Sequence, residues 1–165
     1  MAFGAANEGS GPVRVREFGE LAGLRILPVG SIVQVVTLGA SFVAVGQMAP
    51  EIAARVGWPE ANVWLPESLH QRILSLRMGL FTDLPRAIGY TLWQPTSVHA
   101  DARQANAAYF IVEGEALRRS GLLHGRSVRF VDAVVESRQV GGTSILRLFH
   151  FAPTQRNKGG RQLWP

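Results

Sequence analysis

Residues 127–151, SVRFVDAVVESRQVGGTSILRLFHF, decide the fold. Two runs rich in β-branched and aromatic residues, 127–140 and 143–151, lie on either side of Gly141 and Gly142. A glycine pair between two such runs is typical of a tight hairpin turn, because glycine adopts the positive φ angles that the turn needs. The sequence therefore predicts a long antiparallel hairpin near the C-terminal end.

Shorter candidate elements precede this hairpin. The runs 32–38 and 41–45 predict two strands joined at Gly39, and 50–56, which begins with Pro50, predicts a short helix. The stretch 57–66 is expected to be a loop that carries two tryptophans. The alanine-rich stretch 101–119 is expected to be largely helix, closing at Gly121.

The stretch 69–94 fits two different structures. The segment 69–81, LHQRILSLRMGLF, has an apolar stripe at helical spacing but also alternates as a strand does. The TDLP sequence at 82–85 resembles a turn, and 86–94 is β-prone and ends before Pro95. We therefore favour a second hairpin over this stretch, with a helix at 69–81 as the alternative.

The composition indicates one ordinary domain. The chain has 165 residues, 47% of them hydrophobic, and no cysteine, which excludes disulfides and thiolate chemistry. We expect an ordered domain at 13–153 between a glycine-rich arm, 1–12, and a basic tail, 154–165. Residues 26–50 are uncharged, but prolines, glycines and polar residues divide them into short pieces, so no membrane span is predicted. With no signal-peptide pattern at the start, a cytoplasmic location is the expectation.

The positive charge is concentrated near the C-terminus. Residues 116–165 contain nine basic and two acidic residues, a net charge of +7, and Lys158 is the one lysine among 17 basic residues. Such a region attracts anions, whether nucleic-acid phosphate or a small acid. Arginine is suited to bidentate recognition of carboxylate or phosphate.

Four segments together resemble a known family. The sequences SLRMGLF (75–81), GYTLWQP (89–95), SGLLHGRSVRF (120–130) and GGTSILRLFHFAP (141–153) follow one another as the elements of chorismate pyruvate-lyases and of the related UTRA ligand-binding domains do. The resemblance covers about residues 30 to 153. It implies an α+β fold, chorismate-lyase-like, with a single antiparallel sheet and helices on one side.

The resemblance also implies a binding site. In the family, an arginine of the central strand binds the carboxylate of an aromatic ligand, and Arg77 matches that position. A glutamate on the last strand approaches the ligand; here the matching place is near Phe149, with His150 adjacent and Arg147 two residues earlier. The sequence thus departs from the family by lacking this carboxylate. Arg77, Arg147 and Phe149 are the implied substrate-binding residues, and His150 is the candidate catalytic group.

The residues themselves leave other interpretations open for these positions. Arg147 lies between two leucines, so it must face solvent, pair with Asp132 or Glu136, or bind an anionic ligand. Histidine is suited to proton transfer near neutral pH, yet strand alternation places His150 opposite its phenylalanine neighbours, on a solvent face. Cross-strand pairing of Arg147 and a solvent-facing His150 are the simpler alternatives.

The expected function follows from this resemblance. We expect a small aromatic or cyclohexadienyl carboxylate to bind in a buried pocket, where a cofactor-free lyase reaction would release pyruvate from chorismate or a related acid. The alternatives are a non-catalytic UTRA-like ligand-binding domain and a basic nucleic-acid-binding or assembly protein of a mobile element or virus. No metal is predicted, because the histidines are dispersed, and no nucleotide-binding glycine motif occurs.

Overall fold

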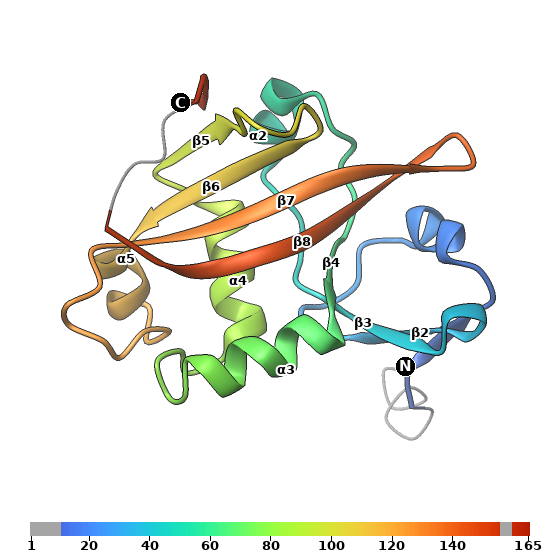
Figure 1. Ribbon diagram of the computed structural model, residues 1–165, viewed down its shortest axis with the longest axis horizontal. Helices are drawn as coiled ribbons and strands as arrows, with labels where there is room; N and C mark the ends of the chain where they lie inside the picture. Colours follow the sequence, from blue (N-terminus) through green and yellow to red (C-terminus); the bar gives the residue numbers. More distant parts are fainter. Residues whose placement is uncertain (1–10, 156–159) are drawn as a thin grey trace.

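The described part of the chain folds around one open sheet of nine strands (Figure 1). The computed structural model describes residues 11–155 and 160–165. In these residues the strand order across the sheet is β1-β2-β3-β4-β8-β7-β6-β5-β9. The strands are β1 (Val13–Val15), β2 (Ile32–Val35), β3 (Ala40–Ala44), β4 (Val63–Pro66), β5 (Ser97–Ala100), β6 (Ala107–Glu113), β7 (Phe130–Val140), β8 (Thr143–Thr154) and β9 (Gln162–Trp164).

Helices occupy the connections between the strands. The α-helices are α2 (Pro50–Val56), α3 (Glu67–Leu76), α4 (Leu84–Trp93) and α5 (Gly114–Arg119). Two short 3-10 helices, η1 (Phe18–Gly23) and η2 (Val36–Leu38), lie near the N-terminus. The predicted α+β class and single sheet are therefore confirmed.

The sheet is mixed, so the prediction of a purely antiparallel sheet is wrong. β1 pairs with β2 in parallel and β4 pairs with β8 in parallel, whereas the remaining neighbours are antiparallel. The β4–β8 pair is short, joining Val63 to Leu146 and Trp64 to Arg147. This pair joins the part of the sheet formed by β1 to β4 to the part formed by β5 to β9. Within each part neighbouring strands are antiparallel, except that β1 is parallel to β2.

The predicted C-terminal hairpin is confirmed as β7 and β8, the two longest strands. Gly141 and Gly142 form its turn with φ angles of 57° and 84°, the left-handed region that the glycine pair predicted. The two early strands are confirmed as β2 and β3, joined through η2 and Gly39. The helix predicted at 50–56 is α2.

The hairpin favoured for residues 69–94 is wrong, because both runs are helices. Leu69 and Ile73 of α3 are buried one turn apart, so the helical stripe at 69–81 was the correct alternative over 69–76. The TDLP sequence begins a helix instead of turning a hairpin: the Asp83 side chain accepts a hydrogen bond from the backbone N of Arg86, and Pro85 occupies the first turn. Arg77 therefore does not lie on the strand that the resemblance to chorismate lyases implies, and this resemblance stays a prediction.

Two strands of the sheet were missed in the sequence. The stretch predicted as a helix at 101–119 forms β6 followed by the short α5, and the expected loop at 57–66 ends in β4. Residues 107–112 of β6 are all buried, as are Val63, Trp64 and Leu65 of β4. A strand buried on both faces reads as a continuous apolar run, which lacks the alternation that distinguishes strands from helices.

Two described parts of the expected tail belong to the sheet. β8 continues to Thr154, and β9 pairs with β5 at the far edge, with Val98 opposite Trp164. Trp164 packs against the core, and the Arg55 guanidinium lies 5.8 Å from the centre of its ring. Arg156 and Lys158, part of the predicted basic tail, lie outside the described residues.

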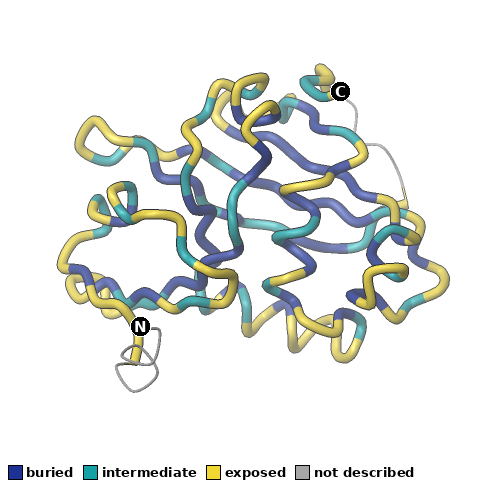
Figure 2. The backbone as a smooth tube through the Cα atoms, turned by 180° about the vertical axis from the view of Figure 1, so that it is seen from behind, coloured by how far each residue is buried: buried dark blue, intermediate teal, exposed yellow. Residues whose placement is uncertain are grey.

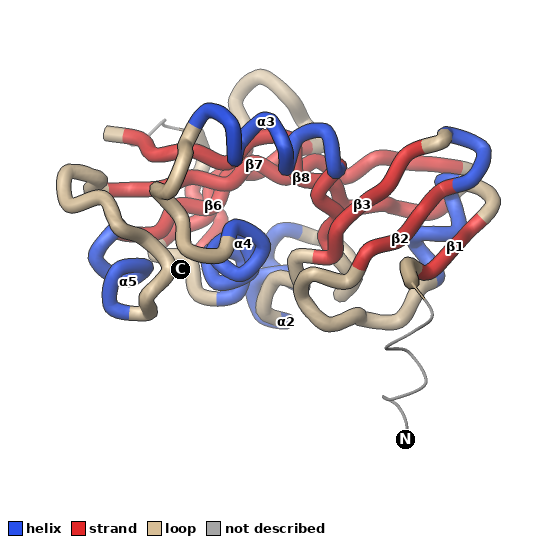
Figure 3. The backbone as a smooth tube through the Cα atoms, turned by 90° about the horizontal axis from the view of Figure 1, so that it is seen from below, coloured by secondary structure: helices blue, strands red, loops and turns tan. Residues whose placement is uncertain are grey.

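The main core lies between the sheet and the α-helices, which all contribute buried side chains to it. Seen from below, α2, α4 and α5 lie on one side of β6, β7 and β8, and α3 runs along the edge of β8 (Figure 3). η1 packs on the opposite face, where its Leu21 belongs to a second buried cluster with side chains of β1 to β4, among them Trp64. The strands of the sheet are largely buried, whereas the loops that connect them are largely exposed (Figure 2). Among the described residues, no helix has the length and apolar character needed to cross a membrane.

Candidate functional site

The site lies along the free edge of β8. Within the described residues, β4 covers only the first half of β8, so residues 148–154 have a strand partner on the β7 side alone. α3 runs beside this open edge (Figure 1). Between them lies a groove of about 310 Å³, called here the α3–β8 groove, which is lined by Leu69, Arg72, Ile73, Leu76, Arg77, Phe149, His150, Phe151 and Ala152.

A bulge in β8 sets the directions of the side chains in the groove. Val134 pairs with His150 but Val135 pairs with Leu148, which leaves Phe149 as the extra residue. Leu148 and Phe151 both point into the main core, three positions apart instead of two. Phe149 and His150 therefore lie between these two core residues, and both of them line the groove.

His150 is held by a buried carboxylate. Its Nε2 lies 3.2 Å from Oδ1 of Asp132 on β7, and the two side chains are 41% and 1% exposed. A carboxylate oxygen can only accept, so Nε2 is the protonated nitrogen and Nδ1 of the neutral ring keeps its lone pair. His150 thus has the fixed tautomer and the solvent access that a general base needs.

Two arginines provide the positive charge of the groove. Arg77 is the C-terminal cap of α3, where its backbone N donates to Ile73 O at 2.8 Å, and its side chain is exposed. Its predicted position on a rigid central strand is therefore wrong, although it does share a groove with Phe149 and His150. Arg72, which lies five residues earlier on α3, is the second cation of the groove.

Arg147 is paired elsewhere. Its Nη2 lies 3.0 Å from Oε1 of Glu136, its partner in the β7–β8 register, and it does not line the groove. This confirms the cross-strand pairing that the sequence suggested. The implied role of Arg147 in binding substrate has no support from its position, because the carboxylate of Glu136 already occupies the guanidinium.

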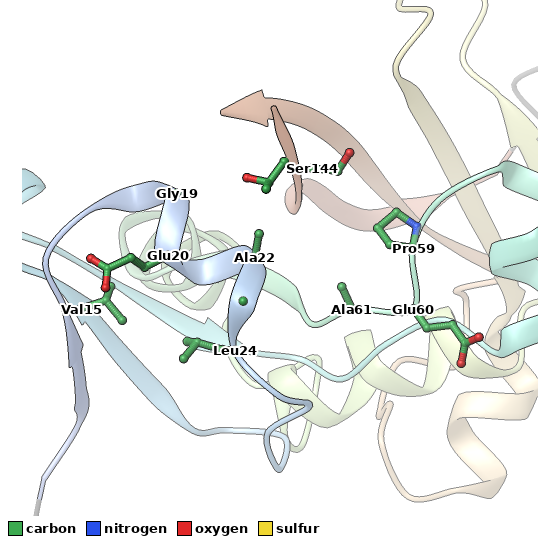
Figure 4. A pocket seen from close by; sticks show the side chains of 11 residues that line it. Val15, Gly19, Glu20, Ala22, Leu24, Pro59, Glu60, Ala61 and Ser144 are labelled. Atoms are coloured by element: carbon green, nitrogen blue, oxygen red, sulfur yellow. The ribbon is translucent and has the colours of Figure 1, made fainter. Parts of the chain in front are cut away.

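A larger hollow is chemically different. It has a volume of about 740 Å³ between η1, the loop before β4 and the β7–β8 turn (Figure 4). Glu20 and Glu60 are its charged side chains, and Glu20 already accepts hydrogen bonds from the backbone N of Arg16 and Glu17. Among the described residues, no cation lines it, so an anionic ligand is disfavoured there.

Further arginines lie near α5. Arg119 and Arg126 are exposed and line a shallow hollow near α5 together with Arg118 and Glu115. This hollow adjoins the loop after α3, because Phe81 forms a β-bridge with Leu123, and Thr82 Oγ1 lies 3.0 Å from Nε2 of His124. Figure 1 shows the two loops side by side. The loop after α3 and the loop after α5, which carries Arg126, are therefore in contact.

A histidine of β5 and a tyrosine of β6 form a buried pair. The Tyr109 ring stacks on His99 at 5.2 Å, and both side chains are buried. Burial raises the pKa of Tyr109, and the nearby carboxylates of Asp101 and Asp132 raise it further. Its phenol therefore stays protonated and neutral over a wider pH range than an exposed tyrosine.

The groove contains no evident metal site. In the part of the chain that the structure describes, no three His, Asp or Glu side chains lie close enough together to hold a metal ion. The donor set at the groove is one imidazole, one carboxylate and two guanidinium groups, which is suited to binding an anion and moving a proton.

The sequence identified part of this site. Arg77, Phe149 and His150 were singled out and are brought together, whereas Arg72 was missed and Asp132 was considered only as a partner for Arg147. The helical stripe of 69–81 was the available signal for Arg72, because it places 72, 73, 76 and 77 near one another. For Asp132 the signal was weaker: an acid in the middle of an apolar strand requires a partner.

Three comparisons with known proteins gave no match. No protein-family model, no curated protein and no solved structure is significantly similar to this chain. The function is therefore argued from the geometry of its own residues.

Proposed function

We propose that the α3–β8 groove binds the phosphodiester backbone of single-stranded RNA and that His150 removes the proton of the attacking 2′-hydroxyl. The observation that carries this proposal is the pairing of His150 with buried Asp132 in a groove that also contains Arg72 and Arg77. A proton acceptor and cations beside one phosphate are the groups that RNA cleavage requires.

The reaction balances with the groups present. Nδ1 of His150 accepts the 2′-hydroxyl proton as the 2′-oxygen forms a bond to phosphorus. The bond from phosphorus to the 5′-oxygen breaks, and the leaving oxygen takes a proton from water. The hydroxide that remains takes the proton from Nδ1, which restores neutral His150. The products are a 2′,3′-cyclic phosphate and a 5′-hydroxyl. Arg72 and Arg77 stabilise the charge on the phosphate oxygens during the attack.

The shape and charge of the molecule favour a polymer over a small acid. The groove is open, since Arg77 is exposed and His150 is 41% exposed, whereas a buried pocket was expected for an aromatic acid. Arg119 and Arg126, which are exposed at the hollow near α5, add positive charge outside the groove. A chain of phosphates can contact both regions, which a single carboxylate cannot.

A small aromatic or cyclohexadienyl carboxylate is the second candidate. Phe149 supplies an aromatic wall beside Arg77, and about 310 Å³ is enough for one ring with its substituents. This ligand agrees with the lyase or UTRA-like function that the resemblance implies.

The test is a cleavage assay on end-labelled RNA and DNA of one sequence. We expect RNA to be cut to 2′,3′-cyclic phosphate ends and DNA to resist, because DNA lacks the 2′-hydroxyl. His150→Ala should lower the rate about 100-fold or more, and Asp132→Asn about 10-fold, as is usual for a base and the group that orients it. Arg77→Gln should weaken RNA binding and reduce its salt dependence.

Arg14→Gln is the matched control, because Arg14 is exposed on β1, an edge strand that β2, β3 and β4 separate from β8. It should cut as the unchanged protein does. Chorismate is assayed in parallel by its ultraviolet absorbance and by pyruvate release. Turnover of chorismate without RNA cleavage would replace the first proposal with the second, and RNA cleavage that survives His150→Ala would contradict the role of His150.

A further inference from the structure

A further hollow lies against α4 and shares no lining residue with the α3–β8 groove. Its walls are the segment 26–29, residues 45–47 after β3, and the face of α4 that carries Arg86, Tyr90 and Trp93. Its volume is about 540 Å³, within the range of pockets for small organic ligands. We call it the α4 pocket.

The walls of the α4 pocket are held in place by the protein itself. The Asn62 side chain, 2% exposed, accepts from Leu27 N at 2.9 Å and donates to Leu24 O and Arg25 O at 3.3 and 2.8 Å. On the opposite wall, a side chain at Gly89 would place its Cβ 2.7 Å from Val45 O, so the glycine lets α4 pack closely. A pocket fixed in this way does not have to order its walls when a ligand binds.

The lining specifies the chemistry of a ligand. Ile26, Val29 and Trp93 are large apolar side chains that remain 42%, 41% and 45% exposed at the pocket. Oε1 of Gln47 is buried with no hydrogen-bond partner among the described residues. Arg86 is exposed, and no carboxylate in the described part of the chain lines the pocket. A ligand must therefore offer an apolar surface, a hydrogen-bond donor and a negative charge.

We propose that the α4 pocket binds a small planar aromatic acid that carries one ring N–H or O–H. The ring would lie against Tyr90, Trp93 and the aliphatic segment 26–29, with its donor toward Oε1 of Gln47 and its carboxylate toward Arg86. A nucleotide fits less well, because its ribose hydroxyls and base edges need more polar partners than Gln47 and Arg86 supply. This inference is independent of RNA cleavage at the α3–β8 groove.

The test uses two ligands of one shape in calorimetric titrations. Indole-3-acetate has a ring N–H, and 1-benzothiophene-3-acetate has sulfur in its place. The unchanged protein should bind indole-3-acetate with Kd below about 1 mM, and the sulfur analogue at least about 5-fold more weakly, because Gln47 then lacks a donor. Gln47→Leu should remove this difference, and Arg86→Gln should weaken indole-3-acetate at least about 10-fold.

Arg77→Gln is the matched control, and it should leave indole-3-acetate binding unchanged. Equal affinities for the two ligands in the unchanged protein, or no binding at 2 mM, would overturn the proposal. Because this comparison uses the unchanged protein alone, it does not depend on whether a variant folds. If Arg77→Gln weakens the binding of indole-3-acetate and Arg86→Gln does not, the acid binds in the α3–β8 groove instead. Tighter binding of adenosine monophosphate than of indole-3-acetate would replace the aromatic acid with a nucleotide. Arg86→Gln should also leave RNA cleavage unchanged, so the two proposals can fail separately.

Discussion

At the scale of single residues, the partners of a side chain depend on the strand register more than on its place in the sequence. Asp132 and Glu136 were both possible partners for Arg147, and the β7–β8 pairing assigned Glu136 to it. The bulge at Phe149 then placed His150, instead of an arginine, beside Asp132. Residue types in the sequence were enough to predict an ion pair on this hairpin, but the bulge left no signal that fixes which acid meets which base.

The buried hydroxyl of Tyr109 gives a prediction on stability. It has no hydrogen-bond partner among the described residues, so its desolvation is not compensated. Tyr109→Phe should leave the free energy of unfolding unchanged or raise it by up to about 1 kcal/mol, as measured in urea. A loss of more than about 1 kcal/mol would show that the hydroxyl has a partner in the folded protein.

His70 on α3 predicts a dependence of stability on pH. Burial lowers its pKa from the ordinary 6.5, and the attraction of Glu67 and Asp83 opposes this only in part. Below about pH 6.5 the unfolded chain binds a proton more readily than the folded chain, so stability falls as the pH falls. His70→Gln should make the fall between pH 7 and 5 less steep in urea titrations, whereas Ser68→Gln, an exposed neighbour, should not. An unchanged slope in His70→Gln would contradict the assignment.

At the scale of elements, the sequence predicted the helices and strands that have a distinctive turn or cap. It missed the elements whose structure depends on the neighbours that they pack against. The Gly141-Gly142 turn and the Pro50 helix start were predicted correctly. β6 was missed because it lies between two neighbours and is buried on both faces. The α3–α4 pair was predicted as a hairpin because TDLP suits both a turn and a helix start, and Asp83 acts as the cap only where a helix follows.

The start of α5 can be tested by one substitution. A Cβ at Gly114 would clash with Val128 O, and Gly114 N donates to Arg129 O at 2.7 Å, so the backbone there cannot move away easily. Gly114→Ala should lower the free energy of unfolding by about 1–3 kcal/mol. Gly19→Ala is the control, because its Cβ would meet only Val140 Cγ1 at an ordinary 3.5 Å. Equal stability of the two variants in urea would contradict this packing.

At the scale of the whole molecule, β9 forms one edge of the open sheet. β9 pairs with β5, Trp164 packs against the core, and Arg55 Nη1 donates to Leu163 O at 3.2 Å. Ending the chain before Gly160 would leave the β5 edge unpaired and remove this packing. We expect Tm to fall by at least about 4 °C and light scattering to rise on heating, since roughly 1 kcal/mol shifts Tm by about 2–4 °C at this size. A truncated protein with unchanged Tm would show that β9 contributes nothing to stability.

The parallel pair β4–β8 has a consequence for how the protein is made. Val63 reaches the ribosome exit long before Leu146, its partner across the sheet. Until the final hairpin emerges, the nascent chain therefore carries a strand of buried residues with nothing on one side, which favours association with other chains or with a chaperone. The order of synthesis delays the completion of the sheet until β8 can fill the place between β4 and β7.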